Sequence, residues 1–186
     1  MCKPLIHFIC GSTGAGKSTF AKRLSEDLGG VVFSIDEWMT ALFWMDSPQP
    51  IESSWALERV DRCQEQIWAT ALRVAERGVP CVLDFGFGMK ALRLKFATRA
   101  AEAGLCVRLH VLDVPAHERW RRVQARNDER GATHHLTFSV TREMFDFVET
   151  MWQPPDADEL ASYERPTGTK RIEAPNRVLS CLTSGP

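Results

Sequence analysis

The residues best suited to chemistry lie near the start of the chain, at positions 11–18. Their sequence, Gly-Ser-Thr-Gly-Ala-Gly-Lys-Ser, matches the pattern G-x-x-x-x-G-K-[ST] at every fixed position. Such a loop turns its backbone N–H groups toward phosphate oxygens, and the helix that follows adds its positive N-terminal end. Lys17 then reaches the β- and γ-phosphates, while the Ser18 hydroxyl ligates Mg²⁺. We predict that the triphosphate site consists of Gly11, Ser12, Thr13, Gly14, Ala15, Gly16, Lys17, Ser18 and Thr19.

The surroundings of this loop support that prediction. An apolar run at 5–10 precedes it, and apolar residues recur at helical spacing after it, at Phe20, Leu24 and Leu28. A strand, a glycine-rich turn and a helix in this order are the structural context of a phosphate site. The alternative, a surface turn rich in glycine and serine, is much less favoured. We expect the nucleotide to be ATP with Mg²⁺, since the sequence N-K-x-D that reads guanine is absent.

Asp36 is the candidate general base. It comes directly after the second apolar run, 31–35, and the phosphate loop comes directly after the first. Because ligands collect at the carboxyl ends of strands in open α/β sheets, the two features are expected to share one crevice. A carboxylate there can accept the proton of an attacking hydroxyl during phosphoryl transfer. The alternative role for Asp36 is the N-cap of a helix over 37–44.

Asp84 ends the third apolar run, 79–84, and is therefore expected at the same edge of the sheet. We predict that it holds Mg²⁺ through water, beside Ser18, or that it orients the acceptor. A plain turn residue at the end of a strand is an alternative with about equal support.

Four arginines recur at spacings of three and four residues, so that one helical face carries Arg119, Arg122, Arg126 and Arg130. A polar segment with a glycine follows. This combination fits a lid over about 119–138 that closes on the phosphates and neutralises the transferring charge. We expect Arg122 and Arg126 to be functional, and the outer two arginines to lie on an ordinary solvated surface. The remaining lid candidates, His134 and His135, are expected to be exposed loop residues.

Aromatic residues follow the candidate base closely, at Trp38, Phe43, Trp44 and Trp55. They could wall an acceptor pocket. Packing between helices explains them at least as well, because Trp38, Leu42 and Met45 share one helical face.

Apolar strand-like runs alternate with helical periods along the chain, which predicts an α/β fold with a parallel sheet and helices on both faces. Strands are expected at 5–10, 31–35, 79–84 and 106–112. Helices are expected over 54–77, 90–103 and 139–151, with another that begins near Pro115. We expect one domain over 1–164, followed by a C-terminal tail, 165–186, with a candidate edge strand at 178–182.

The composition sets wider bounds on function. The 186 residues correspond to one ordinary domain, and the formal net charge of −1 gives no overall attraction toward nucleic acid or anionic membranes. No apolar run approaches the ~20 residues that a membrane helix needs, and the early first strand leaves no room for a signal peptide. Six cysteines show no metal-binding spacing; Cys10, Cys81 and Cys106 are expected as free thiols inside strands. A cytoplasmic protein without a disulfide framework is therefore expected, with its oligomeric state open.

Several segments together resemble a known group of enzymes. Besides the phosphate loop they are Ser34-Ile35-Asp36, Val82-Leu83-Asp84, Leu112-Asp113-Val114-Pro115, Arg122-x-x-x-Arg126-Asn127 and Pro154-Pro155-Asp156. Over about 4–155 the chain is similar to the small P-loop kinases of the zeta-toxin, chloramphenicol-phosphotransferase and polynucleotide-kinase type, which are often grouped as AAA-family ATP-binding proteins. The resemblance implies a three-layer P-loop fold with central strand order 2-3-1-4. It also implies that Asp36 is the base, and that Arg122 and Arg126 belong to the lid.

The sequence departs from the polynucleotide-kinase pattern after Asp84, where Phe85-Gly86-Phe87-Gly88 replaces an Ala-Thr-Asn kind of sequence. This weakens the case for a nucleic-acid acceptor. Our first hypothesis is therefore an ATP-dependent kinase that acts on a hydroxyl of a small molecule, such as a metabolite, a nucleoside-like compound or an antibiotic. The alternatives are a kinase for polynucleotide 5′-hydroxyls or sugar nucleotides, and an ATP-binding switch protein or ATPase with no acceptor except water.

Overall fold

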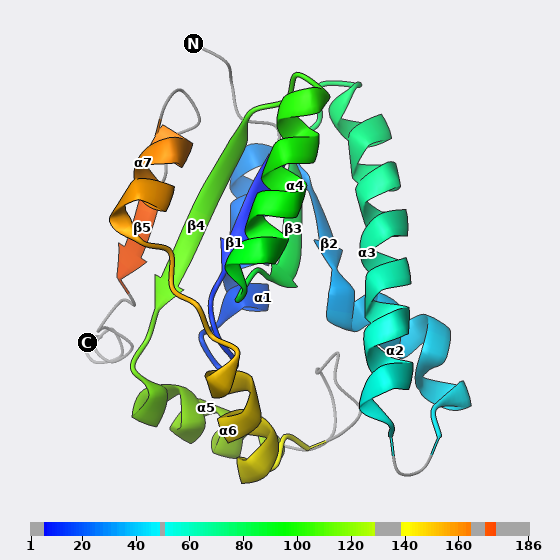
Figure 1. The fold of residues 1–186 in the computed structure, drawn as a ribbon, viewed down its shortest axis with the longest axis vertical. Helices are drawn as coiled ribbons and strands as arrows, with labels where there is room; N and C mark the ends of the chain where they lie inside the picture. The colour runs from blue at the N-terminus through cyan, green and yellow to red at the C-terminus, as the bar shows by residue number, and fades with distance from the viewer. Residues whose placement is uncertain (1–5, 49–50, 129–138, 165–169, 174–186) are drawn as a thin grey trace, which may run out of the picture.

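The computed structural model describes residues 6–48, 51–128, 139–164 and 170–173 (Figure 1). Its strands are β1 (Ile6–Cys10), β2 (Val31–Ser34), β3 (Cys81–Gly86), β4 (Val107–Asp113) and β5 (Lys170–Glu173). Its longer helices are α1 (Lys17–Leu28), α3 (Ser53–Ala75), α4 (Lys90–Glu102) and α5 (Ala116–Asp128). The shorter ones are α2 (Ile35–Phe43), the 3₁₀ turn η1 (Trp44–Asp46), α6 (Arg142–Thr150) and α7 (Ala157–Glu164).

The five strands form one parallel sheet in the order β2-β3-β1-β4-β5. The α/β class and the central order 2-3-1-4 are thus confirmed. The fifth strand pairs with β4 from His110↔Lys170 to Asp113↔Glu173. The edge strand expected at 178–182 lies outside the described residues.

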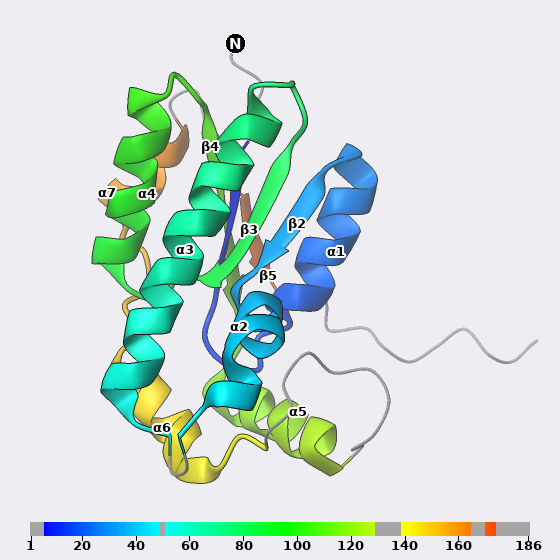
Figure 2. The same ribbon diagram turned by 90° about the vertical axis from the view of Figure 1, so that its right-hand side faces the viewer.

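Helices cover both faces of the sheet, as expected. On one face α3, α4 and α7 pack over a core that includes Phe8, Ile67 and Phe96. On the other face α1 packs over Ile9 and its neighbours. Figure 2 shows the sheet edge-on between these two layers. Phe8 and Ile9 point to opposite faces because successive side chains alternate along a strand.

Two further helices, α5 and α6, lie beyond the carboxyl ends of the strands (Figure 1). They pack on each other through a small apolar cluster of Val123, Val140 and Phe145, with Trp120 against it. Asn127 fastens the end of α5 by donating to the carbonyl of Val140 at 2.9 Å and accepting from its N–H at 3.2 Å. The arginine-bearing helix is thereby held at the edge where the phosphate loop opens.

Two features differ from the sequence-based expectations. Helix α7 occupies a stretch that the proline-rich sequence did not predict; Asp156 starts it by accepting a hydrogen bond from the Glu159 N–H at 2.8 Å. Cys106 is disulfide-bonded rather than a free thiol, and its partner lies outside the described residues. Cys10 and Cys81 are free and buried, as expected. None of the helices in the described ranges has the length and hydropathy to cross a membrane.

Candidate active site

The phosphate loop joins the end of β1 to the start of α1, and its glycines have the backbone that the tight turn requires. Gly14 and Gly16 adopt φ values of 80° and 88°, which L side chains rarely tolerate. A Cβ atom on Gly14 would lie 2.5 Å from the backbone carbonyl oxygen of Arg119. The loop is therefore pressed against α5 with no room for a side chain at this position.

Two polar contacts arrange the groups at the start of α1. The Lys17 ammonium donates to the Ser12 carbonyl at 3.1 Å, and the Ser18 hydroxyl donates to the Asp84 carboxylate at 2.8 Å. The pairing of β2 with β3 sets Asp84 opposite Ser34, at the carboxyl edge of the sheet. The serine and aspartate expected to serve Mg²⁺ are thus in direct contact.

Asp84 is only 4% exposed, and burial raises the pKa of its carboxyl. The charge of Lys17 and the Ser18 hydrogen bond oppose that rise, while Asp36 adds to it. Among the described residues no group of three or more acidic, histidine or cysteine side chains gathers to hold a metal. A Mg²⁺ ion at Ser18 would therefore complete its shell with phosphate and water oxygens, as Mg²⁺ commonly does.

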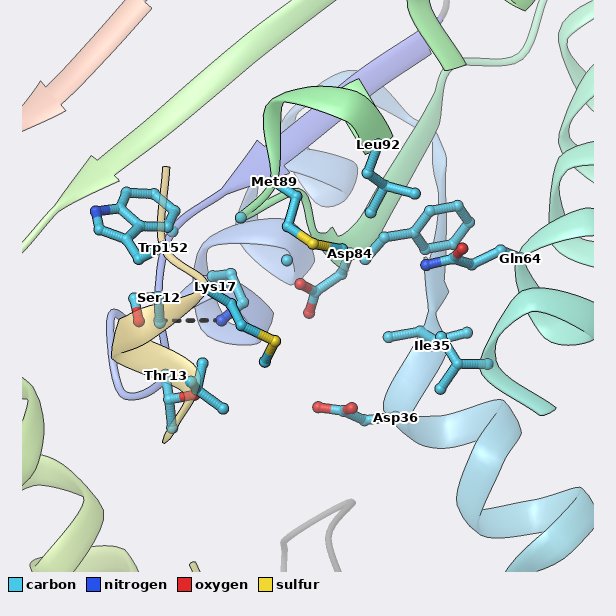
Figure 3. Close-up of a pocket in the computed structure, with 17 residues that line it drawn as sticks. Ser12, Thr13, Lys17, Ile35, Asp36, Gln64, Asp84, Met89, Leu92 and Trp152 are labelled. Carbon is cyan, nitrogen blue, oxygen red and sulfur yellow. Dashed lines mark hydrogen bonds between the residues drawn. The ribbon is translucent and has the colours of Figure 1, made fainter. Parts of the chain in front are cut away.

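Asp36 lies in the first turn of α2 and is exposed. The cap of this helix is Ser34, whose hydroxyl accepts from the Glu37 N–H at 3.4 Å. The alternative role of Asp36 as the N-cap is therefore wrong, because the helix begins at Ile35, two residues earlier than its sequence suggested. Its carboxylate instead points into the space in front of Lys17 (Figure 3).

Asp36 and Lys17 together line two adjoining hollows. The first, which we call the phosphate groove, has a volume of about 610 Å³. Phosphate-loop residues and two arginines of α5 form one side of it, and α6 the other. Its lining includes Gly16, Lys17, Ser18, Thr19, Asp36, Arg122, Arg126, Met144, Phe147 and Val148.

The two inner arginines of α5, which the sequence predicts to be functional, line this groove. Arg122 also pairs with Glu118 one turn earlier. The Nη2 atom of Arg126 is buried and has no hydrogen-bond partner in the part of the chain that the structure describes. Burial lowers the pKa of this guanidinium, and the charge of Asp36 works against that change. A half-buried guanidinium with one nitrogen unpaired among the described residues, beside a phosphate loop, fits the binding of an anion.

Arg119 was expected on the surface, and that expectation is wrong. It is 5% exposed and donates to the carbonyls of Val114 (2.8 Å) and Thr13 (3.2 Å), besides forming a two-pronged ion pair with Glu149 of α6. The same glutamate accepts a hydrogen bond from Ser12. Arg119 therefore anchors the phosphate loop to α5 and α6. The part of the expected lid at 129–138, with Arg130, His134 and His135, lies outside the described residues.

The second hollow, which we call the deep cavity, has a volume of about 290 Å³ and lies between the phosphate loop, β3, α3 and the start of α4 (Figure 3). Most of its wall was not predicted. It is lined by Gly11, Ser12, Thr13, Lys17, Ile35, Asp36, Val60, Gln64, Asp84, Phe85, Gly86, Gly88, Met89, Leu92, Val148, Met151 and Trp152. One signal for it was present in the sequence: Gln64 falls on the apolar stripe of Val60 and Ile67, where a polar side chain indicates a buried partner or a ligand.

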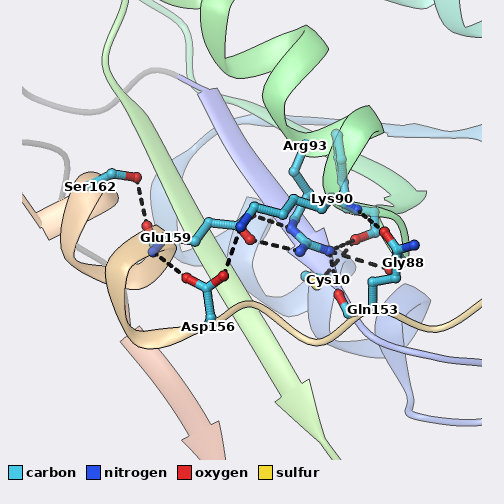
Figure 4. A network of polar contacts seen from close by, with 9 residues as sticks. Cys10, Gly88, Lys90, Arg93, Gln153, Asp156, Glu159 and Ser162 are labelled. Carbon is cyan, nitrogen blue, oxygen red and sulfur yellow. Dashed lines mark hydrogen bonds and ion pairs between the residues drawn. The ribbon is translucent and has the colours of Figure 1, made fainter.

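One wall of the deep cavity is fixed by a buried arginine on α4 (Figure 4). Arg93 is fully buried, forms an ion pair with Glu159 of α7, and donates to the carbonyls of Phe87 and Gln153, both at 2.9 Å. Phe87 has a φ of 44°, which is rare for a bulky residue, and its ring stacks on that of Phe8 with 4.2 Å between the ring centroids. The unusual Phe-Gly-Phe-Gly sequence thus forms a strained turn that Arg93 holds in place.

The aromatic residues near Asp36 belong to packing, as their alternative interpretation had it. Phe43 of α2 meets Trp55 of α3 edge-to-face at 6.5 Å, and Trp38 packs against the main core. The described residues that line the two hollows include none of these four aromatic residues, Trp38, Phe43, Trp44 and Trp55. They position α2, and with it Asp36, without lining either of these two hollows.

A family model described as an AAA domain matches residues 6–151. The chain belongs to this family. The matched AAA domain contains the phosphate loop, Asp36, Asp84, the arginines of α5 and Glu149, whereas α7 and β5 lie beyond it. The match confirms the expected resemblance to small P-loop kinases. Among curated protein sequences no match to the chain is found.

Solved structures share the fold of this AAA domain protein. A Chloroflexus aurantiacus J-10-fl protein assigned as a kinase aligns with a TM-score of 0.66 and 13% identity, over 93% of this chain and 86% of that one. A sugar kinase from Janibacter sp. HTCC2649 aligns with a TM-score of 0.60 and 14% identity, over 92% and 86%. A chain of the Pnkp1/Rnl/Hen1 RNA repair complex gives a TM-score of 0.60 and 19% identity, over 81% of this chain but only 44% of that one. At such identities the likeness establishes the fold.

Proposed function

We propose that the protein is an ATP-dependent kinase that transfers the γ-phosphoryl group to a hydroxyl of a small molecule, with Asp36 as the general base. One observation carries the proposal: Asp36 and Lys17 line the same two hollows, so a free carboxylate faces the group that would hold the γ-phosphate.

The reaction follows from the positions of these groups. The acceptor hydroxyl oxygen forms a bond to the γ-phosphorus, and the bond from that phosphorus to the β–γ bridging oxygen breaks, which releases ADP. The hydroxyl proton passes to the carboxylate of Asp36. Lys17 and the guanidiniums of Arg122 and Arg126 bind the negative charge on the transferring group.

Mg²⁺ bound with the nucleotide would supply positive charge that offsets the negative charge of the phosphates. The residues that would hold it are Ser18 directly and Asp84 through water, since these two are hydrogen-bonded to each other at the start of α1. The unpartnered Nη2 of Arg126 supports the presence of an anion in the phosphate groove.

The test uses γ-labelled ATP with a panel of hydroxyl compounds. We expect Asp36→Asn to lower turnover by roughly 10²–10⁴-fold while leaving ATP affinity nearly unchanged, as removal of a general base does. Glu37→Gln is the matched control, because it removes the neighbouring exposed carboxylate of the same helix. Lys17→Ala should abolish transfer to every acceptor. Loss of ATP affinity in Asp36→Asn with unchanged turnover would contradict the assignment of the base.

The same panel separates the two alternatives. An oligonucleotide with a 5′-hydroxyl tests the polynucleotide acceptor, which is supported by the fold shared with a chain of an RNA repair complex. Binding that falls steeply with salt would favour that reading. Release of phosphate to water alone, unaffected by any alcohol, would instead indicate an ATPase or switch protein.

A further inference from the structure

The deep cavity has a chemical character of its own. We propose that it is the acceptor site and that it takes a compact, uncharged alcohol with a largely apolar body, recognised by the amide of Gln64. The proposal rests on the kinase function above and names the class of its acceptor.

The wall of the cavity is mainly apolar. Eight aliphatic, aromatic or thioether side chains line it: Ile35, Val60, Phe85, Met89, Leu92, Val148, Met151 and Trp152. Ligand sites commonly combine such a wall with a few polar groups that fix orientation. A strongly hydrated acceptor such as an unmodified sugar would lose its water to surfaces that offer it no hydrogen bonds.

The charges in the cavity disfavour an anionic acceptor. Among its lining residues only Lys17, Asp36 and Asp84 are charged, and no arginine is present. Lys17 belongs to the phosphate loop and would be occupied by the donor. A phosphorylated or carboxylated acceptor would therefore meet two carboxylates with no cation of its own.

Gln64 provides the polar recognition. Its residue is 7% exposed, and no hydrogen bond joins its side-chain amide to another of the described residues. Figure 3 shows the amide extending from α3 into the cavity, on the far side from the phosphate loop. An amide has two donors and an acceptor oxygen, so it can bind a hydroxyl, an ether or another amide. A ligand that displaces water from this amide has to supply a hydrogen bond in its place.

The size of the cavity is held by surrounding contacts. Gly88 accepts from the Gln153 N–H at 2.9 Å, and the Gln153 side chain accepts from the Lys90 N–H at 2.9 Å (Figure 4). These bonds and Arg93 join the two segments that carry Met89 and Trp152. A volume of about 290 Å³ lies at the lower end for ligand pockets, which suits a molecule of one or two rings.

The first test compares four alcohols that share a phenylethanol body and differ only in the para group. The group is an ethyl in the first, a carboxamide in the second, a carboxylate in the third and an aminomethyl cation in the fourth. Binding is measured by ligand-observed NMR in the presence of ADP and Mg²⁺, and phosphorylation with labelled ATP. We expect the two neutral alcohols to bind at least 10-fold more tightly than the two charged ones.

Variants then locate the binding. Gln64→Leu should weaken the carboxamide alcohol about 10-fold relative to the ethyl one, with ATP affinity unchanged, because it removes one buried hydrogen bond. Gln66→Leu, an exposed position of the same helix, is its control. Leu92→Trp should fill the cavity and abolish binding of all four, whereas Leu94→Trp on the exposed side of α4 should not. Leu92→Trp also keeps the test decisive if Gln64→Leu does not fold.

The outcomes separate this inference from the kinase function. Tighter binding of the carboxylate or the amine overturns the inference, and so does the absence of binding for all four alcohols at millimolar concentration; both leave a kinase with another acceptor. Neutral alcohols that bind, and lose binding in Leu92→Trp, but are never phosphorylated support the cavity assignment while the kinase function fails.

Discussion

Glu149 of α6 connects the phosphate loop to α5 through Ser12 and Arg119, and a single substitution can remove its charge. Its carboxylate accepts from both terminal nitrogens of Arg119, with Nη1 at 2.7 Å from Oε1, and from the Ser12 hydroxyl. Glu149→Gln keeps the shape and one acceptor oxygen. It leaves the Arg119 cation, 5% exposed, without a counter-charge.

The expected cost follows from the burial of the pair. Breaking a fully buried ion pair destabilises by about 3–5 kcal/mol. Because the Glu149 side chain keeps 25% exposure, we expect about 2–3 kcal/mol of lost unfolding free energy. For a chain of this length that corresponds to a fall in Tm of about 4–12 °C.

Thermal unfolding at pH 7 measures this, with Asp146→Asn as the control. Asp146 also pairs with an arginine, Arg142, on the same helix, but both side chains are more than half exposed, so its loss should lower the Tm far less than Glu149→Gln does. If the two variants melt within 1 °C of each other, the ion pair of Glu149 with Arg119 does not stabilise the fold by the expected amount.

The same variant has a defined pH dependence. The hydrogen bond and charge of Arg119 hold the pKa of Glu149 below its ordinary value of 4.5. Because the folded-state pKa is depressed, the stabilisation is fully present above pH 4.5 and is lost as the pH falls through the lower folded value. The difference in Tm between wild type and Glu149→Gln should therefore shrink below pH 4.5.

Two further substitutions test the site from other directions. Asp84→Asn should weaken Mg²⁺ activation by about 10–100-fold, measured from turnover against Mg²⁺ concentration. The same substitution should also raise Tm at neutral pH, because burial raises the pKa of this carboxyl and makes its ionised form unfavourable in the fold. The gain in Tm should shrink as the pH falls toward 3.8, below which the carboxyl is protonated in both states. A lower Tm at pH 7 would contradict burial as the cause. Gly14→Ala should cost at least about 2 kcal/mol and weaken ATP binding, since its Cβ meets the Arg119 carbonyl at 2.5 Å. Gly29→Ala, with a φ of 61° and no atom within 4 Å, is its control at about 1 kcal/mol, and equal losses in both would exclude the clash.

The arginine helix shows where sequence patterns mislead. Arg119, Arg122 and Arg126 share one face by spacing, so the three are equivalent to a helical template. Only the approach of α6, which brings Glu149 against Arg119, separates a buried anchor from two groove residues. Spacing gives the face of a helix, but it does not give what packs against that face.

Gln64 is the opposite case, a residue that the pattern contained and that was passed over. It shares the apolar stripe of α3 with Val60 and Ile67, and a polar residue on such a stripe indicates a buried partner or a ligand. The helix itself was predicted nearly to its ends. That the amide faces a cavity shared with the phosphate loop depends on how α3 packs on the sheet.

The sequence alone determined what is local. Strand, glycine-rich loop and helix lie within the first 28 residues, and their order predicts the phosphate site because backbone geometry and helix dipole act over a few residues. The alternation of strands and helices likewise predicted the parallel sheet and which ends of its strands carry Asp36 and Asp84. The tertiary structure decided the rest: the contact of Ser18 with Asp84, the anchor of Arg119, and a cavity built by residues from Gly11 to Trp152. Such contacts join positions far apart in the chain, and only the packing of whole elements fixes their distances.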